Sequence, residues 1–481
     1  MDIKNRIVSA TKWSFVTEVL AKLILPVTSM ILARLLTPDA FGVVTSMAII
    51  ISFAEIFMDA GFQKYLIQHE FSDKKEEQQC FNVAFWSNLI MSIAIWILIL
   101  FFSKSLSKTV GSEGYEQALI LASLSLPITA LSSIHLAYYK RALNYKALFK
   151  IRMISSFVPL LVTIPLALYY KNYWALIIGT LAQGIISVIM LRIMSEWKPS
   201  FSFSFIRLKE MLSFSVWSVF EAVSIWLTLY VDIFLIGIYL GQHYVGVYKT
   251  SGALVGQIYA IITSSMTPVL FSSLSRYQND VDEFKKLFFV FQKITAIFVF
   301  PVGVMLFCFQ NSVTTILLGA QWEEAALFVG CWGLSSAFVI VLSHYCSEVY
   351  RSMGNPKLSV LAQWLHLIAL VPVVIYFARD SFETLCTARA LVRIELVAVH
   401  FVIMYYAVRI SPLSMLKNIS TSCVAATVMA IFIYLVKAFV DSTIFLDVFL
   451  MFSAMSLYLG FMFSVRENRE LLLMMKKNLV R

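Results

Sequence analysis

Long apolar stretches separated by short polar turns run along almost the entire chain. A helix that crosses the hydrocarbon core of a membrane needs about 20 mostly apolar residues, and the sequence predicts fourteen such stretches. They span residues 12–33, 40–62, 80–102, 117–138, 152–170, 173–192, 211–238, 244–270, 286–308, 323–348, 358–378, 384–408, 415–438 and 444–464. The segments between them are too short for a soluble domain. We therefore predict an all-α integral membrane protein with about fourteen transmembrane helices.

The composition agrees with a membrane protein. Of the 481 residues, 60% are hydrophobic and 14% are charged, and the mean hydropathy is +0.81, whereas soluble domains carry about 25% charged residues. An ordinary soluble enzyme and a disulfide-rich secreted scaffold are thereby excluded. The chain also has no P-loop, zinc-protease, serine-hydrolase or EF-hand motif. We expect no enzymatic activity, no catalytic residues, no metal site and no cofactor.

The basic residues indicate how the chain is oriented. If both termini are cytoplasmic, the inner segments hold 26 Lys and Arg residues and the outer loops hold six. This alternation follows the positive-inside rule and stays in phase along the chain. We attribute the net charge of +10 to this bias and expect no nucleic-acid partner. We predict a multi-pass membrane protein with both termini in the cytoplasm.

The chain also repeats itself. A shift of 204 residues places Trp13 on Trp217 and Gly42 on Gly246, and aligns the first two predicted helices with the seventh and eighth. Apolar sequences can align by chance, but matching loops favour a true repeat of six helices in one orientation, the parallel repeat of many transporters. The predicted parts are an N-lobe over 1–209, a C-lobe over 210–411, two extra helices over 412–464 and a basic amphipathic cytoplasmic tail over 465–481.

Cations inside the predicted helices are the first candidates for a binding site, since a charge at the bilayer centre costs at least ~2.5–3.5 kcal/mol. Arg389 and Arg393 lie one turn apart in the twelfth helix, and they would repel each other unless an anion lay opposite. The planar guanidinium suits phosphate. Lys22 and Lys249 are further candidates. In the structural alternatives, Lys22 pairs with Glu18 on the same helix face and Lys249 snorkels to the interface.

Acidic residues inside the helices form a second set of candidates. Glu221 and Asp232 share one stripe of the seventh helix, and a polar stripe in lipid is expected to face a cavity. Glu18, Glu55 or Asp232 could carry a coupling H⁺ or Na⁺. Glu395 points away from the two arginines and could pair with a cation on another helix.

Residues 32–44 (LARLLTPDAFGVV) and 59–62 (DAGF) resemble the signature of bacterial polysaccharide flippases. Residues 140–143 (KRAL) and 197–199 (WKP) extend the resemblance. This family belongs to the superfamily of MATE-like multidrug, oligosaccharidyl-lipid and polysaccharide exporters, which includes the lipid II flippases. Gly42 allows close helix packing, so the motif marks the architecture and does not specify a glycan.

The resemblance implies a flippase that translocates undecaprenyl-pyrophosphate-linked oligosaccharides from the cytoplasmic to the outer face of the bacterial inner (plasma) membrane by alternating access. Its product would be O-antigen of lipopolysaccharide, exopolysaccharide or a related polymer. The expected partners are the lipid-linked oligosaccharide, membrane lipids, a polysaccharide polymerase and a chain-length regulator. Because no ATP motif occurs, we expect an H⁺ or Na⁺ gradient to supply the energy.

Two other functions are weighed against the flippase. A MATE-type ion-coupled drug/cation antiporter would favour an acidic, aromatic cavity, and the buried cations count against it. A membrane-bound glycan polymerase or ligase would need a large outer loop, and the outer loops here are short.

Overall fold

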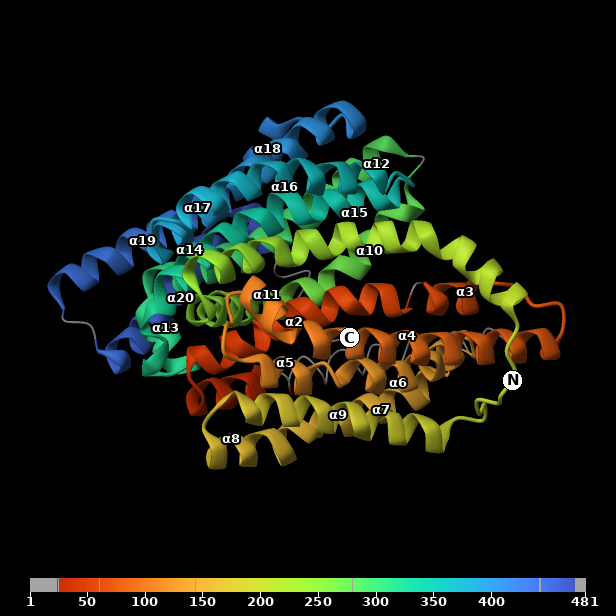
Figure 1. Ribbon diagram of the computed structural model, residues 1–481. Helices are drawn as coiled ribbons and strands as arrows, with labels where there is room; N and C mark the ends of the chain where they lie inside the picture. Colours follow the sequence, from red (N-terminus) through yellow and green to blue (C-terminus); the bar gives the residue numbers. More distant parts are fainter. Residues whose placement is uncertain are drawn as a thin grey trace. The chain divides into compact units, whose positions relative to one another are not determined.

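The computed structural model (Figure 1) describes residue 24 and residues 26–59, 61–142, 144–278, 280–440 and 443–471. Throughout these residues the regular secondary structure is helical, without a β-strand. Thirteen helices there are long and apolar enough to cross a membrane, which confirms the thirteen spans predicted from 40–62 onward. Of the first predicted span, 12–33, residues 26–33 belong to a shorter apolar helix, Pro26–Leu35, and residue 24 is also helical. The rest of that span lies outside the described residues.

The contacts divide the chain into two compact units, and the first ends at Lys249. Its helices are α2 (Pro38–Asp59), α3 (Phe62–Gln68), α4 (Lys74–Thr109), α5 (Glu116–Ala122), α6 (Ser125–Arg141), α7 (Tyr145–Val158), the π-helical turn Pro159–Thr163, α8 (Ile164–Tyr170), α9 (Tyr173–Met194) and α10 (Phe205–Leu240). Within this unit α6 contacts α4 and α9, and α10 contacts α2, α3 and α4. Helix α11 (Gln242–Arg276) begins here and continues into the second unit.

The second unit begins at Thr250. Its further helices are α12 (Val281–Cys308), α13 (Gln310–Leu317), the 3₁₀ helix Ala320–Ala325, α14 (Ala326–Val339), the π-helical turn Ile340–His344, α15 (Tyr345–Ser352), α16 (Lys357–Phe377), α17 (Phe382–Leu391), α18 (Arg393–Ile403), the π-helical turn Met404–Val408, α19 (Pro412–Phe439) and α20 (Ile444–Ser464). Helix α12 contacts α14 and α19, and α19 pairs with α20. The predicted extra helix pair is therefore formed and packs on α12.

The domain boundaries after residues 209, 411 and 464 remain predictions. Of the predicted tail, residues 472–481 lie outside the described part of the chain.

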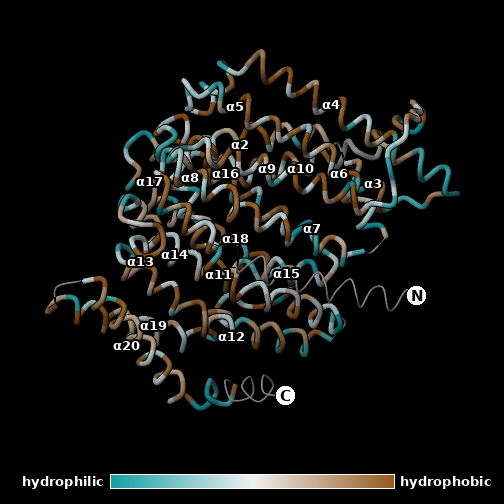
Figure 2. The backbone as a smooth tube through the Cα atoms, turned by 90° about the horizontal axis from the view of Figure 1, so that it is seen from below, coloured by the Kyte–Doolittle hydropathy of each residue, from teal (hydrophilic) through white to brown (hydrophobic). Residues whose placement is uncertain are grey.

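Polar residues at the membrane edges start several of these helices. The side chains of Asp73, Asn172 and Asp280 each accept a hydrogen bond from a backbone N–H in the first turn of α4, α9 and α12, which satisfies a donor that the helix itself cannot. Apolar residues then continue each helix. Figure 2 shows hydrophobic backbone along most helices and hydrophilic positions mainly near turns.

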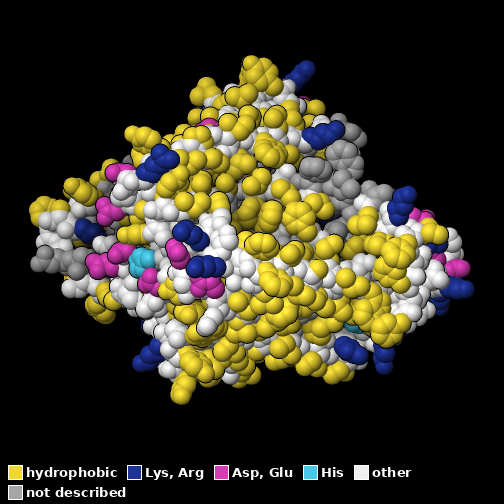
Figure 3. All heavy atoms as spheres, in the orientation of Figure 1, with side chains coloured by type: hydrophobic (Ala, Val, Ile, Leu, Met, Phe, Trp, Pro, Cys, Tyr) yellow, Lys and Arg dark blue, Asp and Glu magenta, His cyan; other side chains and the backbone are white. Residues whose placement is uncertain are grey.

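Large hydrophobic side chains remain on the outside of the molecule. Phe101, Tyr169 and Phe445 are 81%, 80% and 87% exposed, and hydrophobic side chains cover most of the face seen in Figure 3. An apolar surface of this extent indicates contact with lipid. The protein is thus a multi-pass membrane protein.

Two glycines bring α2 and α11 together inside the first unit. A Cβ atom on Gly42 would overlap the carbonyl oxygen of Gln242, and one on Gly246 would lie 2.7 Å from the backbone nitrogen of Gly42. Near this contact Asp39 Oδ2 lies 3.1 Å from His243 Nδ1. Gly42 and Gly246, like Asp39 and His243, are 204 residues apart, which is the shift of the predicted repeat.

Candidate functional site

The two arginines of the twelfth predicted span lie on either side of a break between two helices. Helix α17 begins with Ser381 as its N-cap and ends at Leu391, and α18 begins at Arg393. Arg389 is buried, with 7% of its surface exposed. The two arginines are therefore presented from successive helices with Val392 between them.

Both guanidinium groups face one aromatic ring. The Cζ atom of Arg393 lies 3.9 Å from the centroid of the Trp332 ring, and that of Arg389 lies 4.8 Å from it. Phe328 stacks on the same indole with a centroid distance of 5.3 Å. The negative face of an indole attracts cations, so Trp332 offsets part of the repulsion between the arginines. Sequence reasoning missed Trp332, because a tryptophan in an apolar span is ordinary.

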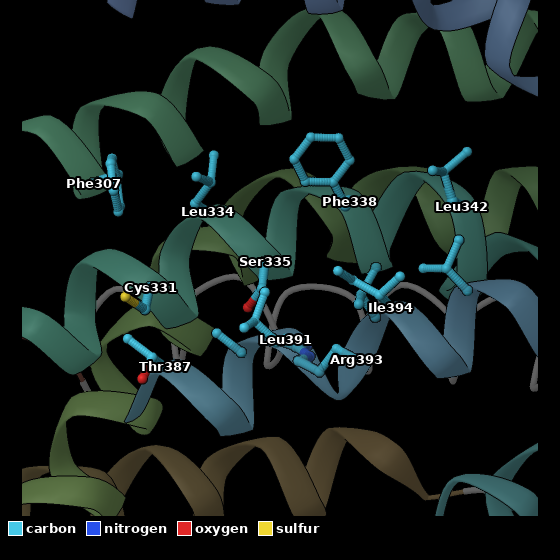
Figure 4. Close-up of a pocket in the computed structure, with 13 residues that line it drawn as sticks. Phe307, Cys331, Leu334, Ser335, Phe338, Leu342, Thr387, Leu391, Arg393 and Ile394 are labelled. Atoms are coloured by element: carbon cyan, nitrogen blue, oxygen red, sulfur yellow. The ribbon is translucent and has the colours of Figure 1, made fainter. Parts of the chain in front are cut away.

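Hydroxyl groups of α14 hold Arg393 in place. Its Nη1 donates hydrogen bonds to Ser336 Oγ at 2.7 Å and to Ser335 Oγ at 3.2 Å. Arg393 also lines a largely apolar cavity of about 460 Å³ between α12, α14, α17 and α18. Figure 4 shows Phe307, Leu334, Phe338 and Leu342 along one side of this cavity and Thr387, Leu391, Arg393 and Ile394 along the other.

Glu395 lies on α18, as Arg393 does, and its side chain faces α16. Its Oε2 lies 2.9 Å from Nδ1 of His366 on α16, and the His366 side chain is only 8% exposed. Histidine is charged only when protonated. The partner of Glu395 is thus a group whose charge can change.

In the first unit, Asp232 is buried and hydrogen-bonded. Its Oδ2 accepts a hydrogen bond of 2.6 Å from the Tyr248 hydroxyl, and its Oδ1 accepts one of 2.8 Å from the backbone N–H of Ile233. The bond from Tyr248 connects α11 with α10, and both bonds partly compensate the carboxylate for its removal from water.

Glu55 and Lys249 both neighbour Tyr230 in the first unit. The Lys249 Nζ lies 5.3 Å from the Tyr230 ring centroid, while Glu55 and Tyr230 line a cavity of about 310 Å³. Trp226 stacks on Tyr230 and donates a hydrogen bond of 3.0 Å to Ser52 Oγ. The structure therefore brings a carboxylate, an ammonium group and two aromatic rings to one region.

A third cavity, of about 290 Å³, shares Ser125, Thr129 and Thr180 with the cavity that Glu55 and Tyr230 line. Its walls on α6, α7 and α9 carry hydroxyl and amide groups, and Gln183 is among them. The Oγ of Ser155, a buried residue of this wall, has no hydrogen-bond partner among the described residues. Sequence reasoning missed these groups, because helical Ser and Thr commonly bond to their own backbone.

Three predicted site residues cannot be placed. Glu18 and Lys22 lie outside the described residues, as does the side chain of Glu221 on α10. Within the described part of the chain, no three His, Cys, Asp or Glu residues are grouped so that they could hold a metal ion.

Solved structures share this fold. The lipid II flippase MurJ in its inward closed conformation matches with a TM-score of 0.74 at 15% identity, over 98% of this chain and 100% of that one. An inward-facing multidrug resistance MATE family transporter of the MOP superfamily matches with a TM-score of 0.63 at 14% identity, over 84% and 95%. By fold, the chain belongs to the class of multi-pass membrane proteins that contains these transporters.

Comparison of the sequence with known families identifies the family of this chain. The model of the family described as "Polysaccharide biosynthesis protein" matches residues 31–327, more than half of the chain. The chain therefore belongs to this polysaccharide biosynthesis family, and the predicted resemblance is confirmed.

Curated relatives agree with this family. The succinoglycan biosynthesis transport protein ExoT of Rhizobium meliloti (strain 1021) is 23% identical, over 74% of this chain and 71% of its own. The lipopolysaccharide biosynthesis protein WzxC of Escherichia coli (strain K12) is 20% identical, over 82% and 76%. The teichuronic acid biosynthesis protein TuaB of Bacillus subtilis (strain 168) is 21% identical, over 67% and 66%. Together with the family match, these relatives favour a polysaccharide flippase over a drug antiporter or an enzyme.

Proposed function

We propose that the protein flips an oligosaccharide linked to undecaprenyl pyrophosphate from the cytoplasmic to the outer face of the bacterial inner membrane. The observation that carries this proposal is the pair Arg389 and Arg393, held on Trp332 inside a membrane-spanning segment. Ionisable residues inside a membrane-spanning segment are rare, and they mark candidate functional sites. A pyrophosphate has the charge and the oxygen geometry that two guanidinium groups recognise.

The hydroxyl-lined cavities of the first unit suit the sugar part of such a cargo. Thr180 and Ser132 donate to backbone carbonyls of their own helices, and each hydroxyl still has lone pairs that can accept hydrogen bonds from sugar hydroxyls. Trp226 and Tyr230 offer aromatic faces beside these groups. A polar wall with aromatic rings is what an uncharged, hydroxyl-rich head group requires.

The transport cycle in this proposal is alternating access. The head group enters from the cytoplasm, binds the arginines, and leaves on the outer side after the protein changes conformation, while the prenyl chain stays in apolar surroundings. Glu55 or Asp232 takes up an H⁺ or Na⁺ that drives the return. The predicted sites Glu18 and Lys22 lie outside the described residues.

The setting of this function is also proposed. Both termini lie in the cytoplasm, and the product passes to a polysaccharide polymerase and a chain-length regulator. The polymer is an O-antigen, an exopolysaccharide, a capsule or a wall polymer.

The test is complementation of a strain that lacks the gene. We expect the wild-type protein to restore surface polysaccharide, and Arg389→Ala/Arg393→Ala to accumulate lipid-linked intermediate on the cytoplasmic side. Arg389→Lys/Arg393→Lys keeps the positive charges but removes the planar guanidinium groups, and it should restore export only in part. The matched control is Arg466→Ala, because the Arg466 side chain is 84% exposed and lies after the last span; it should complement fully.

The same strains separate the flippase from an antiporter. All variants are first compared for membrane abundance and for a single size-exclusion peak, so that a folding defect is recognised. If deletion leaves glycan export intact and changes drug sensitivity instead, the flippase proposal is wrong.

A further inference from the structure

Two cavities of the first unit adjoin each other. The cavity beside Glu55 has a volume of about 310 Å³, and its neighbour has one of about 290 Å³. Ser125 and Thr129 of α6 and Thr180 of α9 line both of them. The two cavities therefore form one region, which we call the hydroxyl recess after the Ser and Thr side chains that they share.

The hydroxyl recess contains a carboxyl group but no cation. Among the described residues that line it, Glu55 is the only charged one. Lys249 lies against the ring of Tyr230, which is a lining residue, but Lys249 does not line the recess itself. An anionic group in the recess would leave water without gaining a positive partner from this lining, and this exchange is costly. The recess is therefore unfavourable for anions.

Two hydroxyl groups of the recess already donate their hydrogen atoms to the backbone. Thr180 Oγ1 donates to the carbonyl of Leu176 at 2.8 Å, and Ser132 Oγ donates to that of Thr129 at 2.9 Å. A hydroxyl group has one hydrogen and two lone pairs. These two side chains can therefore accept a hydrogen bond from a ligand while they keep their own bonds, but they cannot donate one. An ionised carboxylate such as that of Glu55 also only accepts.

Two uncharged side chains of the recess supply donors. Ser155 is 7% exposed, and its Oγ has no hydrogen-bond partner among the described residues. The side-chain amide of Gln183 adds two N–H donors and one carbonyl acceptor. A buried polar group that lacks a partner is unfavourable, so the Ser155 hydroxyl favours a polar occupant. The recess thus combines neutral donors with several acceptors.

An uncharged sugar ring matches these groups. Each of its hydroxyl groups both donates and accepts, so it can satisfy the lone pairs of Thr180 and the hydrogen of Ser155 alike. Its apolar ring face can lie against Leu181, which lines both cavities. Each cavity volume is at the lower end of the usual range for small-molecule sites, ~300–1,000 Å³, which suits a single ring.

An acidic sugar of the same size does not match them. Its carboxylate accepts hydrogen bonds but donates none, so it cannot pair with the lone pairs that Thr180 and Ser132 present. It would also bring a second carboxyl group beside Glu55. Sugars of equal size are therefore distinguished here by their charge.

We propose that the hydroxyl recess is a specificity site that accepts an uncharged sugar of the cargo and excludes an acidic sugar such as a uronic acid. This inference rests on the proposed function, since the sugar is part of the proposed cargo. It adds the charge class of that sugar, and it assigns the selection to the acceptors Thr180 and Glu55 and to the absence of a cation from the described lining.

The experiment measures binding of methyl glycosides to the full-length protein in phosphatidylcholine nanodiscs by saturation-transfer NMR at neutral pH, with empty nanodiscs as the blank. The uncharged probes are the methyl glycosides of glucose, galactose and N-acetylglucosamine, and the acidic probes are those of glucuronic and galacturonic acid. Excess inorganic pyrophosphate occupies the arginine site. We expect the wild-type protein to bind at least one uncharged glycoside about tenfold or more tightly than both acidic ones.

Three variants test which residues make the selection. Thr180→Val keeps the shape of the side chain but removes its lone pairs, so it should weaken binding of the uncharged glycoside about fivefold. Thr129→Lys places a cation in the wall and should make the acidic glycosides bind at least as tightly as the uncharged ones. Thr427→Val is the matched control, because Thr427 donates to the Cys423 carbonyl of its own helix at 2.9 Å but is exposed on α19, outside the recess; it should bind like the wild type.

The outcomes separate this inference from the proposed function. If the acidic glycosides bind to the wild-type protein as tightly as the uncharged ones, or if no glycoside binds, the assignment of the recess is wrong. A preference for uncharged sugars that is unchanged in Thr180→Val and in Thr129→Lys also overturns it. Binding of inorganic pyrophosphate, measured in the same nanodiscs without glycosides, tests the arginine site separately. If pyrophosphate binds while the sugars are not distinguished, only the recess assignment fails; if pyrophosphate does not bind, the proposed cargo fails.

Discussion

The contact between Gly42 and Gly246 leads to a prediction whose size can be worked out. In Gly42→Ala the new Cβ would overlap the carbonyl oxygen of Gln242 and lie 2.6 Å from its carbonyl carbon. Carbon atoms in favourable contact are ~3.5–4.0 Å apart, so α2 and α11 would have to separate by about 1 Å. Because the clashing atoms belong to the backbone, no side chain can rotate away to relieve the overlap.

The expected loss of stability combines two effects. Overpacking a well-packed contact usually costs about 1–3 kcal/mol, and a clash with backbone belongs at the upper end of that range. Replacing Gly by Ala inside a helix gains about 1 kcal/mol. We therefore expect Gly42→Ala to lower the free energy of unfolding by about 2 kcal/mol. With the change in Tm per kcal/mol that is usual for units of this size, the Tm should fall by roughly 4 °C.

Thermal unfolding in detergent, followed with a thiol-reactive dye, measures this change. Cys80, Cys346 and Cys386 are buried, and they should react with the dye only as the protein unfolds. Gly256→Ala is the control, because this glycine also lies in α11 and its Cβ would meet nothing within 4 Å; its Tm should equal or exceed that of the wild type. If Gly42→Ala melts like Gly256→Ala, the close contact between the helices is not a source of stability.

Three further predictions concern other contacts. Asp447→Ala removes the buried carboxylate that lies 3.3 Å from the Lys437 ammonium group, and we expect the free energy of unfolding to fall by about 3 kcal/mol in the thermal assay. The double variant Lys437→Met/Asp447→Leu should recover most of this stability, and no recovery would contradict the explanation. Trp332→Phe weakens both cation–π contacts, together by ~1 kcal/mol, so pyrophosphate affinity should fall about fivefold by calorimetry; unchanged affinity would refute the role of the ring. The hydrogen bond from Lys293 lowers the pKa of Glu467 below its usual 4.5, so this pair stabilises the protein at neutral pH and is lost as the pH falls through the lowered pKa. The Tm difference between wild type and Glu467→Gln should therefore vanish in acid, and a difference that persists there would count against the pair.

The membrane-spanning helices could be predicted from the sequence because their signal is local. Each depends only on the length and apolarity of one segment, as in 444–464, which coincides with α20 (Ile444–Ser464). The positions of breaks within spans were not predictable in this way. The interruption at Val392, between α17 and α18, falls inside the continuous stretch predicted over 384–408, and both helices pack against α14 and α16.

The candidate site could be predicted only in part. Arg389 and Arg393 stand out because a charge is rare in an apolar helix, whereas Trp332 does not. The hydroxyl-lined cavity escaped prediction for a similar reason. Ser155 and Thr180 are unremarkable in separate helices, and only the packing of α7 and α9 brings them to one wall.

The most direct test of the central claim is translocation by the purified protein in proteoliposomes. Lipid-linked oligosaccharide extracted from the deletion strain is incorporated into both leaflets, and a membrane-impermeant glycan oxidant is added outside. We predict that vesicles with the wild-type protein expose nearly all of the glycan to the oxidant, while empty vesicles and those with Arg389→Ala/Arg393→Ala protect the inner-leaflet share. If the inner-leaflet glycan is protected equally in wild-type and empty vesicles under every imposed H⁺ and Na⁺ gradient, the proposed flippase activity is contradicted.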